Sequence, residues 1–474
     1  MDNHLILVTG ATGYIAGRLI PQLLQKGYRV RCMARDPRRL HGRTWYSRVE
    51  VVAGDVTLPE TLPPVMQDVR AAYYLIHNMS SGRDYTRRDL QGAHNFARAA
   101  AQAGIDQIIY LGGLADPQAP IAPHIRSRIE TGQALRKGPV PVTEFRAGVI
   151  VGPGSISFEM IRFMTEQFPI VVGPRWLRHR TQPIDARNVL DYLLSALDVT
   201  ASRGGIYEIG GQDVMTYAET MLRYARLRGL WRGLITIPFL PLELMAWGVD
   251  KLTPVPLTIA RPLIEGLKCD SLVRVDDALR VFPHIQPTGY ETAVTYSLSQ
   301  LSPEEIEHVW TDDALPVTAL KHEGFFVDHR RILVDAPPEA IYRTLTSLGG
   351  ANGWLVAGWL WKLRGWIDRL VGGPGLRGRS DPQTLRSGET LDFYRVEVLQ
   401  PGHMLRLYSE LKAPGDGWME WRVVPQEDGD TLLTQTGFFA PRGMPGFLYW
   451  YVLSPFHVFV LRGLIRALAH KAEA

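Results

Sequence analysis

The stretch that decides the fold lies at the start of the chain, where residues 5–17 read LILVTGATGYIAG. Its first four residues form a continuous apolar run, which is typical of a buried parallel strand. A glycine-rich turn follows, and residues 18–27 predict an amphipathic helix that ends at a glycine. Residues 28–34 predict the next strand. This order of strand, glycine turn, helix and strand is typical of a dinucleotide-binding unit.

The glycines of this turn have distinct tasks in such a site. We expect Gly10 to allow the tight turn, Gly13 to let the backbone approach a pyrophosphate, and the small Ala16 to let the helix pack on the strand. The helix then offers free amides and the positive end of its dipole to the phosphates. A plain strand–helix turn is the alternative interpretation. The predicted phosphate site comprises Gly10, Thr12, Gly13, Tyr14 and Ile15.

The end of the second strand bears on the choice of cofactor. An acidic residue at this position binds the ribose 2′-hydroxyl of NAD, whereas this chain has Arg35, whose guanidinium suits a 2′-phosphate. The sequence therefore favours NADP, with NAD as the alternative. Two observations keep the alternative open, because Arg35 could instead stack on the adenine and because the carboxylate of Asp36 could still reach a ribose.

Strands and helices continue to alternate along the next hundred residues. Further strands are predicted at 49–56, 71–77, 107–113 and 142–148, with a helix over about 85–104. This alternation predicts an α/β fold, a doubly wound parallel sheet of the Rossmann-like type. Ligands bind beyond the carboxyl ends of such strands, which is where Asp55, His77, Gly112 and Gly148 fall.

Length, charge and cysteine content limit the number of domains and the kinds of ligand that we expect. The 474 residues predict two to four domains of ordinary globular composition. A net charge of +4 gives no electrostatic argument for nucleic-acid binding. The two cysteines, Cys32 and Cys269, form no CxxC pair, and the chain enters its first strand directly, so we expect no metal site and a cytoplasmic location.

Four segments together resemble the atypical short-chain dehydrogenase/reductase superfamily, and within it the NmrA-like, complex-I-subunit-like branch. They span much of residues 5–290 and are TGATGYIAG at 9–17, GDV at 54–56, the run from Arg146 to Gly154, and QPIDARNVLDYL at 182–193. The resemblance implies that Asp55 and Val56 contact the adenine side of the cofactor and that Leu75 and His77 line the nicotinamide ribose. It also implies that residues 205–290 form the variable substrate-binding portion.

The chain departs from this superfamily where catalysis is expected. A serine after the fifth strand and a Tyr-x-x-x-Lys pair on the next helix are replaced by LGGL at 111–114 and by HIRSR at 124–128. His124 could act as a general acid, since an unperturbed histidine titrates near neutral pH, and a surface-loop histidine is the alternative. Arg128 could hold a ribose or phosphate, and Ser127 is the nearby hydroxyl.

Two middle segments have open interpretations. Residues 174–180 carry three arginines and a histidine, which indicates either recognition of an anionic or extended planar substrate or a solvated loop anchored by Trp176. Residues 240–249 are apolar and predict either the wall of a hydrophobic pocket or ordinary core.

The last third of the chain has a different pattern. After a predicted linker at 301–322, residues 323–474 read as strand, helix, several strands and a closing helix, which resembles the α+β helix-grip (START/SRPBCC-like) fold. Seven of the 12 tryptophans lie here, which indicates an aromatic ligand cavity or a large core. The Gly-rich run 372–379 suggests a hairpin connection, with an anion-binding nest as the alternative.

Residues 443–461 contain no charged side chain. Two prolines weaken the interpretation as a membrane span, so we predict an apolar approach followed by the closing helix from about residue 455. Peripheral membrane contact through Tyr449, Trp450 and Tyr451 is the alternative.

The sequence thus predicts an NADP(H)-binding oxidoreductase that acts on a bulky apolar small molecule and binds no nucleic acid. The alternatives are a non-catalytic NADP(H) sensor or assembly factor, and a carrier of hydrophobic ligands with a vestigial reductase domain.

Overall fold

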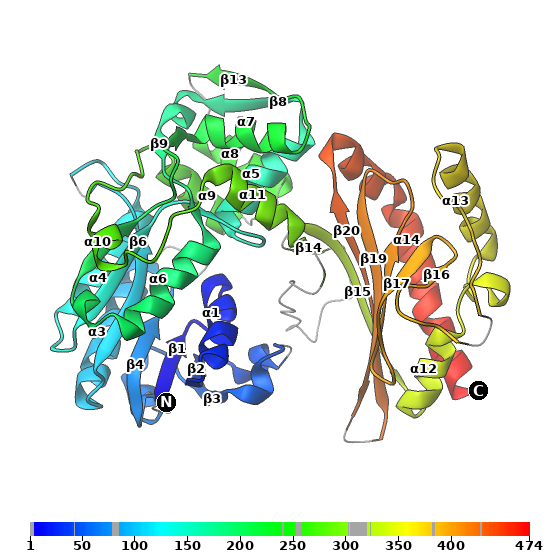
Figure 1. Cartoon of the computed structure of the whole chain (residues 1–474), viewed down its shortest axis with the longest axis horizontal. Coiled ribbons are helices and arrows are strands. Elements are labelled where there is room, and N and C mark those ends of the chain that lie inside the picture. The colour runs from blue at the N-terminus through cyan, green and yellow to red at the C-terminus, as the bar shows by residue number, and fades with distance from the viewer. Residues whose placement is uncertain are drawn as a thin grey trace. The chain divides into compact units, whose positions relative to one another are not determined.

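The computed structural model describes residues 4–41, 43–77, 85–116, 118–238, 241–252, 257–301, 303, 320–322, 324–381, 384–426 and 429–474. The chain forms two compact units, Met1–Asp312 and Asp313–Ala474 (Figure 1). Residues 304–319 of the predicted linker lie outside the described residues, while its last residues form a strand, β14 (Leu320–His322).

The first unit is built on a seven-stranded parallel sheet with the strand order β11-β6-β5-β4-β1-β2-β3. This confirms the predicted doubly wound α/β fold, because the order reverses between β1 and β4, as in dinucleotide-binding sheets. The seven strands are β1 (Leu5–Thr9), β2 (Arg29–Ala34), β3 (Glu50–Ala53), β4 (Val69–Tyr74), β5 (Gln107–Gly113), β6 (Val142–Ala147) and β11 (Ile206–Ile209).

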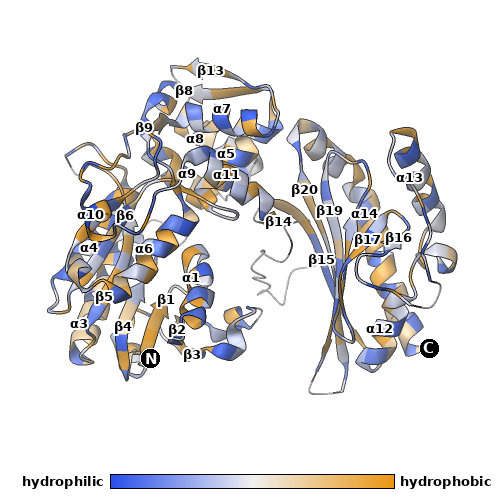
Figure 2. Cartoon of the chain, viewed as in Figure 1, coloured by the Kyte–Doolittle hydropathy of each residue, from blue (hydrophilic) through white to orange (hydrophobic). Residues whose placement is uncertain are grey.

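Helices cover both faces of this sheet. The helices described in the first unit are α1 (Tyr14–Gln25), α2 (Leu62–Met66), α3 (Tyr85–Gln102), α4 (Pro123–Arg136), α5 (Ile156–Gln167), α6 (Ala186–Asp198), α7 (Tyr217–Leu227), α8 (Leu242–Leu252), α9 (Leu257–Gly266), α10 (Asp277–Val281) and α11 (Tyr290–Ser299). Of these, α5, α7, α8 and α9 pack in clusters of their own beyond the sheet. Alternate residues of β1 explain the layers, since Ile6 and Val8 pack towards α1 and α6, and Leu5 and Leu7 towards α2 and α3. Figure 2 shows β1 as largely hydrophobic.

Short strand pairs join the segments beyond the sheet. They are β7 (Ile150–Val151) with β10 (Ile184–Asp185), β9 (Arg180–Thr181) with β12 (Met215–Thr216), and β8 (Ile170–Pro174) with β13 (Gly233–Ile237). Part of the stretch expected to bind substrate, 205–290, instead belongs to the main sheet, because β11 pairs with β6 and Phe282 is buried in the core beneath it.

The second unit is an antiparallel sheet with helices, in the order β14-β15-β20-β19-β18-β17-β16. Its strands after β14 are β15 (Phe325–Val334), β16 (Thr390–Leu391), β17 (Tyr394–Gln400), β18 (Met404–Ser409), β19 (Gly415–Pro425) and β20 (Thr431–Pro441). Its helices are α12 (Pro338–Thr346), α13 (Gly358–Leu370) and α14 (Gly443–Glu473). The sequence interpretation did not include α13.

Helix α14 corrects a prediction, because the uncharged stretch 443–461 is helical from its first residue rather than an apolar approach to a later helix. Pro455 lies inside the helix and cannot donate to the carbonyl of Tyr451 one turn earlier. The hydroxyl of Ser454 donates to that carbonyl at 3.1 Å instead. The local sequence therefore compensates for the proline.

By length and composition, α14 could cross a membrane, and it is the one such helix in the part of the chain that the structure describes. One side of the helix packs against β15 and β20, with Trp450 stacked on Phe326 at 5.1 Å and on Phe439 at 5.6 Å between ring centres. Trp450, which the alternative interpretation placed at a membrane interface, is therefore part of the core.

Candidate functional site

The glycine turn after β1 fits a dinucleotide phosphate site. Gly10 has a φ of +68°, and a Cβ there would lie 2.6 Å from the carbonyl oxygen of Leu75, so only glycine fits. Gly13 is the N-cap of α1, and no side chain caps this helix. The first-turn amides, including those of Tyr14 and Ile15, therefore lie at an uncapped helix start. The carbonyl of Thr12 accepts from Arg43 Nη2 at 3.2 Å.

The run from Arg146 to Gly154 lies against the same helix. Arg18 Nη2 donates to the carbonyl of Pro153 at 2.8 Å, and its guanidinium lies 4.1 Å from the ring centre of Tyr14. A side chain at Gly152 would overlap the Tyr14 hydroxyl. The glycine and proline of this segment thus allow the chain after β6 to approach the glycine turn.

Arg35 and Asp36 differ in how they are placed at the end of β2. Arg35 is exposed and makes no hydrogen bond or ion pair within the described residues. The Asp36 carboxylate caps the next turn through the amide of Arg38 at 3.1 Å and also accepts from Arg38 Nε at 2.9 Å. Its bond to Arg38 lowers the pKa of Asp36. The rival carboxylate is therefore engaged locally, whereas the Arg35 guanidinium is accessible.

The two residues predicted for the adenine side differ in accessibility. Asp55 Oδ1 accepts from the amide and the hydroxyl of Thr57, both at 2.8 Å, and the side chain is half-buried. Val56 is buried, and its side chain packs where a Cβ on Gly92 would lie. The Val56 side chain is therefore part of the core, and only its backbone could face a ligand.

Beyond β4, a buried carboxylate joins two of the predicted residues. Asp89 Oδ2, on α3, lies 3.0 Å from His77 Nδ1 and accepts from the Ser127 hydroxyl at 3.2 Å. Burial lowers the pKa of His77, against the opposing effect of Asp89. Asp89 thus connects the end of β4 with α4. The Ser127 hydroxyl is used in its hydrogen bond to the Asp89 carboxylate.

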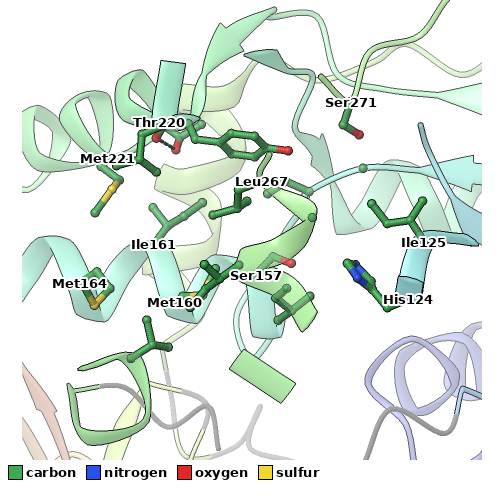
Figure 3. A pocket seen from close by; sticks show the side chains of 18 of the residues that line it. His124, Ile125, Ser157, Met160, Ile161, Met164, Thr220, Met221, Leu267 and Ser271 are labelled. Carbon is green, nitrogen blue, oxygen red and sulfur yellow. Dashed lines mark hydrogen bonds between the residues drawn. The ribbon is translucent and has the colours of Figure 1, made fainter. Parts of the chain in front are cut away.

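A pocket of about 160 Å³ opens beyond the carboxyl ends of β5 and β6. His124, Arg128, Gly113 and Gly148 line one part of it, and the remaining walls come largely from β8, α5, α7, α8 and α9. In Figure 3, His124 and Ser271 lie towards one side of the view and Met164 and Met221 towards the other. The structure therefore brings the predicted catalytic pair, His124 and Arg128, together in an apolar pocket.

His124 corrects the surface-loop interpretation, because it is the second residue of α4 and only 7% exposed. Burial, with smaller effects of Arg128 and His77, lowers its pKa to about 3. Its Nδ1 atom is buried and has no hydrogen-bond partner among the residues that the structure describes. The expected titration near neutral pH is therefore wrong, and the imidazole is neutral at physiological pH.

Arg128 lies one helical turn after His124. Its Nη2 donates to the carbonyl of Leu111 at 3.0 Å, and its own carbonyl accepts from the Tyr110 hydroxyl at 2.8 Å. Gly113 lines the pocket beside Arg128, whereas the predicted Gly112 faces Tyr110. Arg128 is the one formally charged side chain among the lining residues.

Two glycines hold the pocket's polar groups close to the backbone. A Cβ on Gly148 would lie 2.7 Å from Ser271 Oγ, and that hydroxyl donates to the carbonyl of Leu114 at 2.9 Å. Gly266, at the end of α9, packs against the ring of His124. Neither Ser271 nor Gly266 was predicted, and neither follows a pattern that would have pointed to the site.

The residues that line the pocket bear on the two interpretations of segments 174–180 and 240–249. Met245 and Val249 of α8 line the pocket, which supports the pocket-wall interpretation of 240–249. From the basic segment 174–180 only Leu177 lines it, and the Arg180 guanidinium is held by Asp270 at 3.0 Å. This segment places no cation in the pocket.

Asp89 and Arg43 are further residues that the sequence did not indicate. Both are buried and contact predicted site residues, one through His77 and the other through Thr12. Among the described residues no group of three His, Cys, Asp or Glu side chains could hold a metal ion.

The second unit has its own pocket of about 480 Å³, between the sheet, α13 and α14. The Gly-rich run 372–379 lies nearby, where Asp368 accepts from the amide of Gly375 at 2.8 Å and from that of Lys412 at 2.7 Å. The Asp368 carboxylate therefore already binds the Gly375 amide, which an external anion would have to bind if the run 372–379 were an anion-binding nest.

Comparisons with known proteins agree with this division. Residues 10–129 match the NAD(P)H-binding family, and residues 322–464 match a family described as a protein of unknown function, DUF2867. Photosystem II assembly factor Ycf39 of Trieres chinensis is 24% identical over 244 residues, which cover 51% of this chain and 74% of that protein.

Two solved structures share the fold of the first unit. Triphenylmethane reductase of Citrobacter sp. has a TM-score of 0.51 and 21% identity, and NADPH-dependent quinone oxidoreductase of Escherichia coli, complexed with NADPH, has 0.50 and 16%. Each alignment covers 62% of this chain and 99% of the other. The first unit therefore has a Rossmann-like fold, and its first 129 residues include a match to the NAD(P)H-binding family.

Proposed function

We propose that the first unit is an NADP(H)-dependent reductase of an apolar carbonyl or quinone compound. The observation that carries the proposal is the pocket beyond β5 and β6, where His124 and Arg128 lie among walls that are largely apolar. In doubly wound sheets this edge is where the reacting end of a dinucleotide and its substrate meet.

The preference for NADP rests on the end of β2. The turn with Gly10 and Gly13 would hold the pyrophosphate, and Asp55 and His77 would flank the two ribose ends. Arg35 would form an ion pair with the 2′-phosphate, because its guanidinium is exposed and the neighbouring Asp36 is bound to Arg38.

Pocket size and chemistry bear on the substrate class. A volume of about 160 Å³ is comparable with cavities that accept a single aromatic ring. Methionine is the flexible gap-filler of binding surfaces and contacts aromatic rings favourably. Four methionines line the pocket: Met160, Met164, Met221 and Met245. We therefore propose a ring-sized apolar group at the reacting end, with any larger part of the substrate outside the pocket.

The chain's residues would assist reduction through hydrogen bonding and charge. The bound cofactor would supply a hydride and water would supply a proton, so that a carbonyl compound would gain CH–OH in place of C=O and a quinone would become a hydroquinone. His124, kept neutral by burial, would donate an N–H bond to the oxygen being reduced. The positive charge of Arg128 would stabilise negative charge developing there.

Oxidation of NADPH, followed by absorbance with a panel of quinones and enones, tests the reaction. Turnover by the wild type and a loss of about tenfold or more in His124→Leu are expected, since leucine has no hydrogen-bond donor for a developing oxyanion. An unchanged rate in His124→Leu would show that the imidazole does not have this role. Absence of NADPH oxidation across the panel would contradict the reductase proposal.

A second comparison tests the cofactor. Arg35→Ala is expected to weaken NADPH binding by about tenfold to a hundredfold and to leave NADH binding nearly unchanged. Arg48→Ala, which removes another exposed arginine of the same region, is the control. Equal weakening of both cofactors would mean that Arg35 stacks on the adenine instead.

A non-catalytic NADP(H) sensor or assembly factor is the second candidate for the first unit. The low pKa of His124 and the missing serine, tyrosine and lysine favour it, and Ycf39, named as an assembly factor, is a relative. Tight NADPH binding without oxidation is the result that this candidate predicts.

For the second unit we propose a helix-grip fold that holds a hydrophobic ligand, as in the carrier alternative. Its pocket of about 480 Å³ lies in the range of small-molecule sites and is lined by aromatic and aliphatic side chains. Mass spectrometry of an organic extract of the purified protein tests this, and recovery of no apolar compound would contradict the carrier.

A further inference from the structure

Helix α13 exposes a row of apolar side chains along the side that is not buried in the second unit, and part of this row borders the pocket of that unit. Within the second unit, the opposite face is the buried one and includes Trp361, Gly365 and the carboxylate of Asp368. The outward residues recur at helical spacing and are Trp359, Leu363, Trp366 and Leu370, with Trp359 67% exposed. An ordinary surface helix has the reverse arrangement.

Helix α14 repeats this arrangement. One of its sides contacts the sheet through buried residues such as Phe447 and Leu464. The other side exposes a row of apolar residues at helical spacing, namely Leu448, Val452, Phe456 and Phe459, the last being 67% exposed. We call the exposed apolar residues of the two helices, 359–371 and 448–459, the apolar stripe.

The apolar stripe is continuous with the pocket of the second unit. Some side chains both line that pocket and are exposed at the surface, so the pocket reaches the surface between the two helices. These are Leu363, Ile367 and Val371 on α13, and Val452 and Phe456 on α14. Figure 2 shows hydrophobic residues along both helices.

The charges beside the apolar stripe are positive. Residues 358–370 and 443–466 of the two helices carry five basic residues, Lys362, Arg364, Arg369, Arg462 and Arg466. Their one acidic residue is Asp368, which is buried and bound to backbone amides. Exposed tryptophans with flanking cations are typical of helices that lie in the interface of an anionic membrane.

We propose that the apolar stripe docks the second unit on the surface of a bilayer that contains anionic lipids, with the mouth of the pocket facing the lipids. The helices lie in the interface and do not cross it, because the inner side of α14 packs on β15 and β20. Apolar molecules dissolved in the bilayer then have a direct path into the pocket. This inference does not depend on the reductase proposal.

Flotation of the full chain with lipid vesicles tests the proposal. Two vesicle types are compared, phosphatidylcholine alone and phosphatidylcholine with phosphatidylglycerol. Binding is expected to the second type, weaker to the first, and to decrease as salt is added. Leu370→Glu on α13 and Phe459→Glu on α14 are each expected to weaken binding by about tenfold or more. Trp231→Glu, at a 75% exposed tryptophan of the first unit, is the control and should bind as the wild type does.

Fluorescence quenching of the wild-type protein is a second test that does not depend on the variants. Tryptophan fluorescence should be quenched by vesicles whose acyl chains carry bromine, because Trp359 and Trp366 would lie at that depth. NADPH binding of each variant, expected to be unchanged, reports that the first unit is intact.

Absence of both flotation and quenching overturns the proposal. So does binding that the two stripe variants leave unchanged. A third outcome is that the wild type does not bind vesicles but is a dimer by light scattering, while the stripe variants are monomers. In that case a second copy of the chain covers the apolar stripe, and the membrane proposal is wrong.

Discussion

The imidazole of His124 lies directly against Gly266, where an added Cβ would come within 2.7 Å of the ring carbon Cε1. The two residues are 142 positions apart, so the end of α9 fixes the orientation of a side chain on α4. This contact makes the pocket sensitive to a single methyl group.

Gly266→Ala should displace the imidazole and lower the free energy of unfolding of the first unit by about 1–3 kcal/mol, because the packed ring has little room to move. Urea unfolding measures this. Gly248→Ala is the matched control, since a Cβ there meets nothing within 4 Å and an alanine favours the helix. Equal stability of the two variants would show that the contact is loose.

The low pKa of His124 predicts a pH-dependent loss of stability. Below pH 6.5 the unfolded chain binds a proton at this residue, whereas the folded chain binds it only near pH 3. Stability therefore falls as the pH decreases from 6.5 towards 3. At pH 5 the wild type should have lost about 2 kcal/mol more than His124→Gln, relative to pH 7.5. Identical pH profiles of the two proteins would mean that the imidazole titrates normally.

Gly10→Ala should weaken NADPH binding by about tenfold or more, because its Cβ would collide with the Leu75 carbonyl and move the turn. Gly104→Ala is the control for the strain of placing alanine at a positive φ, since Gly104 has nearly the same φ as Gly10 but open space around its Cβ position. Fluorescence titration with NADPH distinguishes them. If both variants bind NADPH alike, the turn does not hold the cofactor.

Trp450→Ala should lower the thermal transition of the second unit, because a buried ring stacked on Phe326 and Phe439 is lost, at a cost of about 3–5 kcal/mol. Val452→Ala, two residues later and exposed, should change stability by less than about 0.5 kcal/mol. Calorimetry of the full chain separates the transitions. A change in the thermal transition no larger than that of Val452→Ala would mean that α14 does not pack on β15 and β20 through Trp450.

The dinucleotide half of the fold could be predicted because its signals are local. Buried parallel strands such as residues 5–9 are continuous apolar runs, and Gly10 and Gly13 mark the turn between strand and helix. The strand at 107–113 was predicted with its observed bounds for the same reason.

Helix α13 and the start of α14, before residue 455, could not be predicted from comparable signals, whereas the rest of α14 was predicted. The aromatic residues around Trp450 favour strands locally, and Pro455 signals a helix break, yet packing on the sheet and the Ser454 hydroxyl override both. The tryptophans of this region indicated either a ligand cavity or a large core, whereas Trp359 and Trp366 of α13 are exposed.

The site itself was only partly accessible from sequence. His124 and Arg128 were found through resemblance to a family motif, but the environment that lowers the pKa of His124 is made by distant segments. Asp89 joins His77 to Ser127 across three elements, and no spacing in the sequence records that contact.

The chain order of the site has a consequence for how such proteins diversify. Every residue predicted to contact the dinucleotide precedes position 149, whereas the walls from α5, α7, α8 and α9 all begin after position 155. A single recombination event between these points would exchange the specificity walls together with β11 and α6, which complete the core of the sheet, and would keep every residue predicted to contact the dinucleotide. A new second segment would therefore have to preserve the buried residues of β11 and α6 while its pocket walls changed.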